Sequence, residues 1–185
     1  MLKIHIPETD KEFFNDKTEE FITVKCKETD ITLEHSLISI SKWEAKYHKP
    51  FLNIDKPKTT KEMQDYVRFM SLSSNIDPNV FLVIPQSEWT RINKYIEDKQ
   101  TATTFSDEKT GRKSREIITS ELIYYWMVAL QIPFECQKWH INRLLTLIKI
   151  CNIKNQPAKK MNPKDVLSQN RALNAQRRAR LHSRG

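Results

Sequence analysis

The sequence predicts an α+β fold, in which a small N-terminal antiparallel sheet and a later β-hairpin pack with a mainly helical core. Three stretches of the first 34 residues alternate apolar with polar side chains, which is the period of half-buried strands. From Ser36 onward the apolar residues recur three or four positions apart, as on one face of a helix. A basic segment closes the chain. We therefore expect a globular α+β domain over residues 1–153 and a basic, partly helical or disordered tail over 154–185.

The strands of the expected sheet are separated by turn-prone polar residues. They cover residues 2–6, 20–26 and 30–34. The spacing of apolar residues changes from that of a strand to that of a helix at the His35-Ser36 junction. Ser36 is there a residue of the type that caps helix N-termini. A helix is expected from there to Pro50, which cannot continue it.

Two further helices are expected from similar start signals. Thr59 or Thr60 is expected to cap the second, with Glu62 in its first turn. Ser87 is expected to cap the third, in which Trp89 and its apolar neighbours recur at helical spacing. Both helices should contribute an apolar stripe to the core.

The segment after residue 100 is expected to form a hairpin and then two core helices. Thr101–Ser106 and Arg115–Thr119 flank a polar turn around Gly111 and are the expected hairpin strands. Thr119 or Ser120 should open a helix that is apolar almost all round, which predicts the central core helix. A last core helix follows Ile132-Pro133. The four tryptophans are expected in the core, and one of them, Trp139, is also placed to help form a docking groove.

Positive charge is concentrated at the C-terminal end. The 185 residues include 31 Lys plus Arg and 23 Asp plus Glu, a formal charge of +8. Residues 155–185 hold eight Lys or Arg and the single acid Asp165, a net charge of +7, which leaves +1 for residues 1–154. A tail helix is expected to start with Asn162 as cap, Pro163 at the first helical position and a hydrophobic contact from Met161 to Val166. We expect this helix to be marginal alone and to become ordered on a partner.

The scarcity of glycine excludes several classes of enzyme site. Only Gly111 and Gly185 are present. Dinucleotide fingerprints, Walker loops and nucleophile elbows each need several glycines within a short span, because only glycine allows those backbone turns. We therefore expect no such site and no cofactor.

Cysteine usage and hydropathy indicate the compartment. The three cysteines, Cys26, Cys136 and Cys151, are far apart and odd in number, which favours reduced thiols. The longest apolar run, Leu122–Leu130, is far shorter than the roughly 20 residues of a membrane helix. We expect a soluble, intracellular protein that does not associate with a membrane.

One catalytic pattern is present in outline. Ser39 and Lys42 fit S-x-x-K, Ser73-Ser74-Asn75 fits a loose S-x-N, and Lys109-Thr110-Gly111 fits K-T-G, in the order that penicillin-binding acyltransferases use. The short patterns are degenerate, and Lys109 belongs to a polar turn rather than a core strand. We therefore reject this site.

A metal site is also rejected on spacing. Cys136 and His140 are four residues apart and could supply two ligands. None of the remaining candidates, Cys151, His35 and Cys26, has the spacing of further ligands. A buried thiol and a hydrogen-bonded core histidine are the better interpretations.

The basic tail leaves two kinds of partner open. Arginine-rich helices bind nucleic-acid phosphates, but this tail lacks the aromatic residues that stack on single strands. A cationic arm can equally hold an acidic, helical protein. From the residues alone we expect partner contact from a tryptophan, a leucine and five arginines: Trp139, Arg143, Arg171, Leu173, Arg177, Arg178 and Arg180.

Five stretches, in order along most of residues 30–185, resemble the tail assembly chaperones of long non-contractile-tailed, siphovirus-type bacteriophages. They are Leu33–Phe51, Thr101–Phe105, Ile118–Phe134, Trp139–Asn152 and Asn170–Gly185. The resemblance implies a non-enzymatic late protein of virion assembly that binds the long, helical, aggregation-prone tape-measure protein. It would help tail-tube protein subunits polymerise in the host cytoplasm and leave before the virion is complete, with self-association as a further possibility. A small basic nucleic-acid-binding phage protein and a structural tail component are the alternatives.

Overall fold

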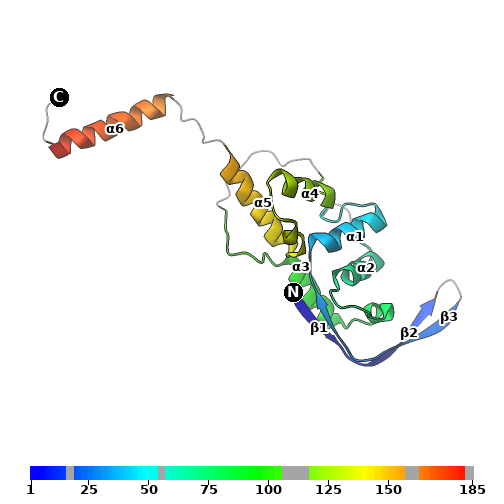
Figure 1. Ribbon diagram of the computed structural model, residues 1–185. Helices are drawn as coiled ribbons and strands as arrows, with labels where there is room; N and C mark the ends of the chain where they lie inside the picture. The colour runs from blue at the N-terminus through cyan, green and yellow to red at the C-terminus, as the bar shows by residue number, and fades with distance from the viewer. Residues whose placement is uncertain (16–18, 54–56, 106–116, 157–162, 182–185) are drawn as a thin grey trace. The chain divides into compact units, whose positions relative to one another are not determined.

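A computed structural model describes residues 1–15, 19–53, 57–105, 117–156 and 163–181. The chain divides into two compact units, Met1–Cys151 and Asn152–Gly185. The first contains all the strands of the described chain and most of its helices, and the second contains the C-terminal helix (Figure 1). The expected α+β class is confirmed. The division falls two residues before the boundary expected from composition.

The N-terminal strands form one long antiparallel ribbon. Its strands are β1 (Leu2–Ile6), β2 (Thr9–Asn15), β3 (Glu20–Cys26) and β4 (Thr29–Leu33). The strands β1 and β4 pair, and so do β2 and β3. The register continues without a shift between the two pairs, because Ile6 lies opposite Thr29 and Thr9 lies opposite Cys26. The pairing is interrupted around Pro7, which has no N–H to donate, and the ribbon bends near its middle (Figure 1). The strand β2 was not expected from the sequence.

The β1–β4 half of the ribbon packs on the helical core. One face of this half is buried through Ile4, Ile6, Ile31 and Leu33. The outer edge of β4 is also occupied, since the Leu72 N–H donates to the carbonyl oxygen of Thr32 at 2.9 Å. The ribbon is therefore anchored at this end by both its side chains and its backbone.

Six α-helices and two short 3₁₀ helices follow in the described residues. They are α1 (Leu37–Tyr47), α2 (Thr60–Met70), η1 (Pro78–Leu82), α3 (Gln86–Glu97), α4 (Ser120–Ala129), η2 (Phe134–Lys138), α5 (Ile141–Asn155) and α6 (Pro163–Leu181). Three expected caps are confirmed: Ser36 for α1, Thr59 for α2 and Thr119 for α4. The expected cap at Ser87 is wrong, because α3 already begins at Gln86, directly after Pro85.

The core lies between the ribbon and the helices α1 to α5. Its largest fully buried side chains, on α1 and α2, are Trp43 and Tyr66. The other three tryptophans, Trp89, Trp126 and Trp139, are half-buried at its edge. Of the four tryptophans expected in the core, one is thus fully buried and three are partly buried against it.

The expected β-hairpin is not formed by the residues described on either side of its turn. Thr101–Phe105 and residues 117–119 are irregular, while the turn at Gly111 lies outside the described residues. The Thr101 hydroxyl accepts a hydrogen bond from the Thr103 N–H at 3.1 Å, which offers the backbone a local alternative to strand pairing. The polar turn around Gly111 therefore did not correctly predict strands over the described residues that flank it.

The helix expected at the centre of the core lies at its surface. Only Ser120, Ile123 and Met127 of α4 are buried. The helix therefore packs on the rest of the unit along one side only. Its other apolar residues remain in contact with solvent.

The tail helix begins at Pro163, as expected. The expected cap Asn162 and the contact residue Met161 lie outside the described residues. The described side chains of α6 are exposed to solvent.

Candidate partner-binding surfaces

A buried carboxylate fixes the start of α4. Glu44 on α1 accepts hydrogen bonds from the Phe51 N–H and the Ser120 N–H, both at 2.7 Å. Ser120 is the first residue of α4, so the negative charge lies against the positive end of that helix. The contact ties the first turn of α4 to α1.

The outward side of α4 is apolar. Ile123 and Met127 are one turn apart and face the core. Tyr125 and Val128 lie on the opposite side and are 65% and 60% exposed. Neither side chain is needed by the core of this unit, so α4 carries more apolar surface than its own packing uses.

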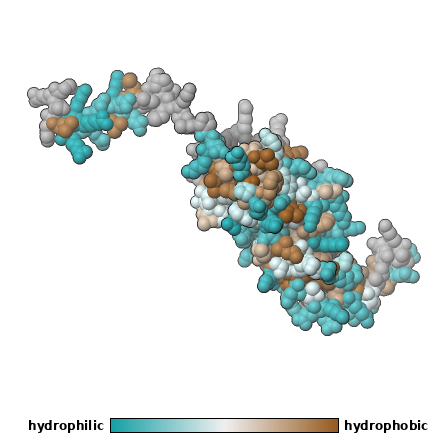
Figure 2. Space-filling view, viewed as in Figure 1, coloured by the Kyte–Doolittle hydropathy of each residue, from teal (hydrophilic) through white to brown (hydrophobic). Residues whose placement is uncertain are grey.

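The segments just before and just after α4 in the sequence also carry exposed apolar side chains. Ile117 and Ile118 precede α4 and are exposed, and Phe134 follows it and is 53% exposed. The Phe134 ring lies 6.5 Å from that of Tyr124 on α4. We refer to Ile117, Ile118, Tyr125, Val128 and Phe134 as the α4 surface. Figure 2 shows hydrophobic residues gathered over α4 and α5 on the side in view.

The far end of the ribbon carries a smaller aromatic cluster. Phe14 and Phe21 lie opposite each other on β2 and β3, with ring centroids 5.2 Å apart in an edge-on arrangement. They are 53% and 72% exposed. Two rings that cover each other only in part form a second, smaller apolar patch.

Two of the predicted partner residues are brought together. The Arg143 guanidinium lies 4.3 Å from the centroid of the Trp139 ring. Trp139 is half-buried and Arg143 is exposed, so the pair presents one face to solvent. The arrangement is a cation–π contact of the kind that stabilises surface aromatic residues.

The other predicted partner residues lie on α6, in the second unit. Arg171, Leu173, Arg177, Arg178 and Arg180 are all exposed. Sequence reasoning therefore selected accessible residues on α6, but it missed the α4 surface. A helix that is apolar all round does not reveal which of its sides faces the core.

In the rejected metal half-site, Cys136 and His140, the histidine ring is engaged in internal hydrogen bonds. His140 Nε2 donates to the Tyr95 carbonyl oxygen at 2.9 Å, and its Nδ1 accepts from the Asn142 N–H at 3.3 Å. Both ring nitrogens are thus engaged. Burial raises the pKa of the Cys136 thiol, which disfavours the thiolate that a metal would need. Among the described residues, no group of three or more His, Cys, Asp or Glu side chains is placed to hold a metal ion.

His140 belongs to a buried polar cluster at the junction of β4, α2 and α5. Its ring packs edge-on against that of His35, with centroids 4.9 Å apart. Nδ1 of His35 is hydrogen-bonded to the Tyr66 hydroxyl. Burial lowers the pKa of His35 to about 3, with a further contribution from His140, and burial also lowers the pKa of His140. Both imidazoles are therefore neutral near pH 7. The cluster has a structural role, because it connects β4, α2 and α5.

The described residues of the rejected acyltransferase pattern have separate structural environments and do not form one site. Ser39 is buried and its hydroxyl donates to the Ser36 carbonyl oxygen at 2.7 Å, as part of the cap of α1. Lys42 is exposed, on the same helix. Ser73 accepts a hydrogen bond from the Thr32 N–H, and Lys109 lies outside the described residues. The Ser39 hydroxyl has a capping role and does not face a substrate space.

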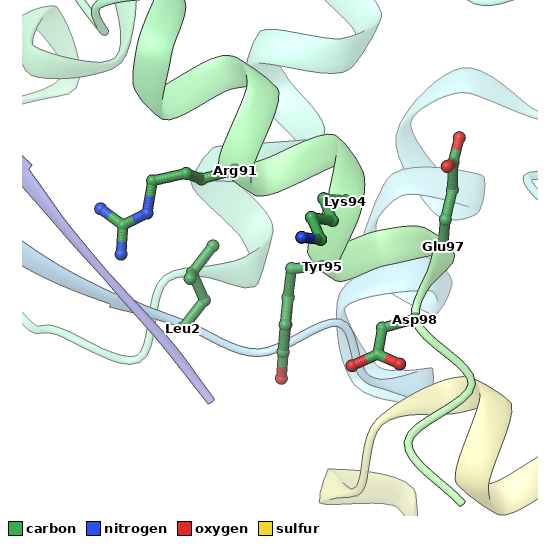
Figure 3. A pocket seen from close by; sticks show the side chains of 6 residues that line it. All are labelled: Leu2, Arg91, Lys94, Tyr95, Glu97 and Asp98. Carbon is green, nitrogen blue, oxygen red and sulfur yellow. The ribbon is translucent and has the colours of Figure 1, made fainter.

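A cavity of about 580 Å³ lies beside the C-terminal half of α3. Its lining combines two cations, two acids, an aromatic and an aliphatic side chain: Arg91, Lys94, Glu97, Asp98, Tyr95 and Leu2 (Figure 3). Arg91 donates to the Lys3 carbonyl oxygen and Tyr95 donates to Glu34 Oε1, at 2.9 and 2.7 Å. Glu97 points away from the other side chains (Figure 3). Arg91 and Tyr95 thus serve internal contacts, and the polar groups of the lining do not converge on one position.

Comparisons with protein-family models, with curated proteins and with solved structures find no match. None of the helices in the described parts of the chain combines the length and the apolar character needed to cross a membrane. The fold and its surfaces define a small α+β protein with an exposed apolar surface and a separate basic helix.

Proposed function

We propose that this protein is a non-enzymatic tail assembly chaperone of a long non-contractile-tailed bacteriophage. It binds the tape-measure protein in the host cytoplasm and assists polymerisation of the tail tube around it. The observation that carries the proposal is the α4 surface, with Tyr125 and Val128 more than half exposed on a helix held in place by Glu44. Exposed apolar surface of this kind marks a site of protein association.

The α4 surface fits a helical client. An amphipathic helix binds by placing its apolar face on a hydrophobic surface of its partner. A long helical protein that has not yet been enclosed by the tail tube exposes such faces and aggregates through them. Covering them transiently requires a rigid apolar surface but no catalytic group.

Charge favours an apolar mode of binding by the first unit. Residues 152–185 hold nine Lys or Arg and one acid, a net charge of +8, so residues 1–151 have a net charge of zero. Net charge therefore supplies little long-range attraction for this unit, and binding through the apolar α4 surface is driven by apolar burial, which salt screens only weakly. We expect the complex with the client to survive an increase in salt concentration.

The test is coexpression with the tape-measure protein of the same phage. The double substitution Tyr125→Ser and Val128→Ser removes the centre of the α4 surface without touching a buried residue. Leu72→Ser with Leu82→Ser is the matched control, because both leucines are exposed and lie elsewhere in the same unit. We expect at least about a tenfold loss of co-purified client for the first variant only.

Co-purification of undiminished client with the Tyr125/Val128 variant would overturn the proposed role of the α4 surface. A second readout is the composition of purified virions. A chaperone is expected to be absent from them, whereas detection of stoichiometric amounts would support a structural tail component instead.

A further inference from the structure

We infer that α6 is a binding helix for duplex DNA, which contacts the phosphates of both strands from the major groove without reading sequence. This inference goes beyond the proposed function and does not rest on it, because the α4 surface belongs to the other unit. It rests on the charge of the second unit and on the way in which the side chains are distributed around α6.

All the net charge of the protein lies in the second unit. Residues 152–185 carry +8, while the first unit is neutral. Four arginines fall within the described, exposed part of α6: Arg171, Arg177, Arg178 and Arg180. Such a density of cations favours a partner that is a polyanion.

The arginines are spread over about half of the helix circumference. Each residue of an α-helix advances by about 100°. Arg178 therefore lies within about 20° of Arg171, Arg177 lies about 120° from it, and Arg180 lies on the opposite side. A flat acidic surface would meet only some of these side chains. A partner with negative charge on two sides of the helix can meet all of them.

The leucines of α6 do not form a docking stripe. Leu173 lies about 120° around the helix from Leu167, and Leu181 returns to the side of Leu167 only after about four turns. All three are exposed. A helix that docks in a protein groove needs apolar anchors at i, i+3 or i+4, and i+7 on one side. The pattern thus favours an electrostatic partner over an apolar groove.

The major groove of DNA has the shape that this distribution requires. It is about 12 Å wide and admits an α-helix, whose diameter with side chains is about 10–12 Å. Phosphates then line both sides of the helix. The A-form RNA major groove is too narrow for such entry, and α6 has no aromatic residue to stack on single strands. Its 19 residues extend over about 28 Å, or roughly eight base pairs.

The experiment measures binding of the full-length protein to a fluorescent DNA duplex of about 16 base pairs, twice this length, by anisotropy at several salt concentrations. The four arginines are changed together to Gln in one variant and to Lys in the matched control, which keeps the charge. Each phosphate contact contributes about 0.9 to the slope of log K against log salt. In the Gln variant, we expect the magnitude of this slope to be smaller by about 3 to 4. In the Lys variant, we expect the slope to be unchanged.

Unchanged binding by the Gln variant, or no salt-dependent binding by the unmodified protein, would overturn the inference. Three competitors at equal charge distinguish the source of the polyanion: duplex RNA, single-stranded DNA and polyglutamate. Tighter binding of any of them than of the DNA duplex would also overturn it, with polyglutamate pointing to an acidic protein partner. The Tyr125/Val128 variant should bind DNA normally, so failure here is distinguishable from failure of the proposed function.

Discussion

Glu44 connects α1 to the start of α4. Its carboxylate is buried and accepts two backbone N–H groups, those of Phe51 and Ser120. In Glu44→Gln, one of these N–H groups would face the amide NH₂, which is a donor, and would lose its acceptor. We expect the free energy of unfolding to fall by about 1–3 kcal/mol, as measured by urea unfolding. Glu97→Gln, on an exposed carboxylate, is the control and should change it little.

The buried histidine cluster predicts sensitivity to acid. The pKa of His35 is about 3 in the folded protein against an ordinary value of 6.5, so protons bind preferentially to the unfolded chain. The stabilisation is complete above about pH 6.5 and is lost progressively as the pH falls toward 3. From pH 7 to pH 5 we expect His35 to contribute a loss of about 2 kcal/mol.

Urea unfolding at pH 7 and pH 5 tests this prediction. The lowered pKa of His140 acts in the same direction and adds to the loss from His35. In His35→Gln the loss between the two pH values should shrink by the His35 contribution, whatever the variant's stability at pH 7. An equal loss in the variant would show that other groups cause the acid sensitivity.

At the scale of elements, the sequence predicted best where a local side chain determines the structure. Ser36 and Thr59 cap α1 and α2 through hydrogen bonds to residues three positions away, so their roles can be inferred from nearby sequence alone. The cap at Ser87 failed because Pro85 ends the preceding segment and the helix starts at once. Pro85 and Ser87 are both typical of a helix start, and neither residue by itself shows at which of the two positions the helix begins.

The cap of α2 gives a prediction at this scale. The Thr59 hydroxyl accepts from the Glu62 N–H, and Glu62 accepts in return from the Thr59 N–H. Thr59→Ala removes the first of these bonds, and we expect a loss of about 1 kcal/mol in thermal or urea unfolding. Thr60→Ala is the matched control, since Thr60 is also an exposed threonine but lies inside the helix. A smaller loss at Thr59 than at Thr60 would contradict the capping role.

Two elements were misjudged because their environment is set by distant parts of the chain. The strand β2 has the sequence TDKEFFN, which is polar apart from two adjacent phenylalanines and so shows no alternation. It forms because β3 lies opposite it in a register continuous with the anchored β1–β4 pair. In α4, Ile123 and Met127 are buried while Tyr125 and Val128 are exposed, and this difference depends on which side of the helix the rest of the unit covers. Local periodicity contains neither piece of information.

At the scale of the whole molecule, the two units divide the chemistry between them. The first is neutral and presents the α4 surface, and the second holds the net charge and α6. The α+β class and the basic tail were predicted from the sequence, because composition and periodicity determine them. The α4 surface was not, because it consists of apolar residues that the core leaves uncovered.

This division predicts that the first unit does not depend on the second for stability. Ending the chain at Gln156 retains α5, which finishes at Asn155, and removes α6. We expect the free energy of unfolding of the remainder to change by less than about 0.5 kcal/mol. Circular dichroism during urea unfolding would measure it. A loss of several kcal/mol would show that α6 supports the core.

The central claim is that the α4 surface holds the client, and site-specific photo-crosslinking tests it most directly. The amino acid p-benzoylphenylalanine is placed at position 125, and in the control at position 82, where Leu82 is likewise exposed. Each protein is coexpressed with the tape-measure protein and irradiated. We predict a crosslinked product with the client from position 125 and not from position 82. An intact complex that yields no crosslink from position 125 would contradict the claim.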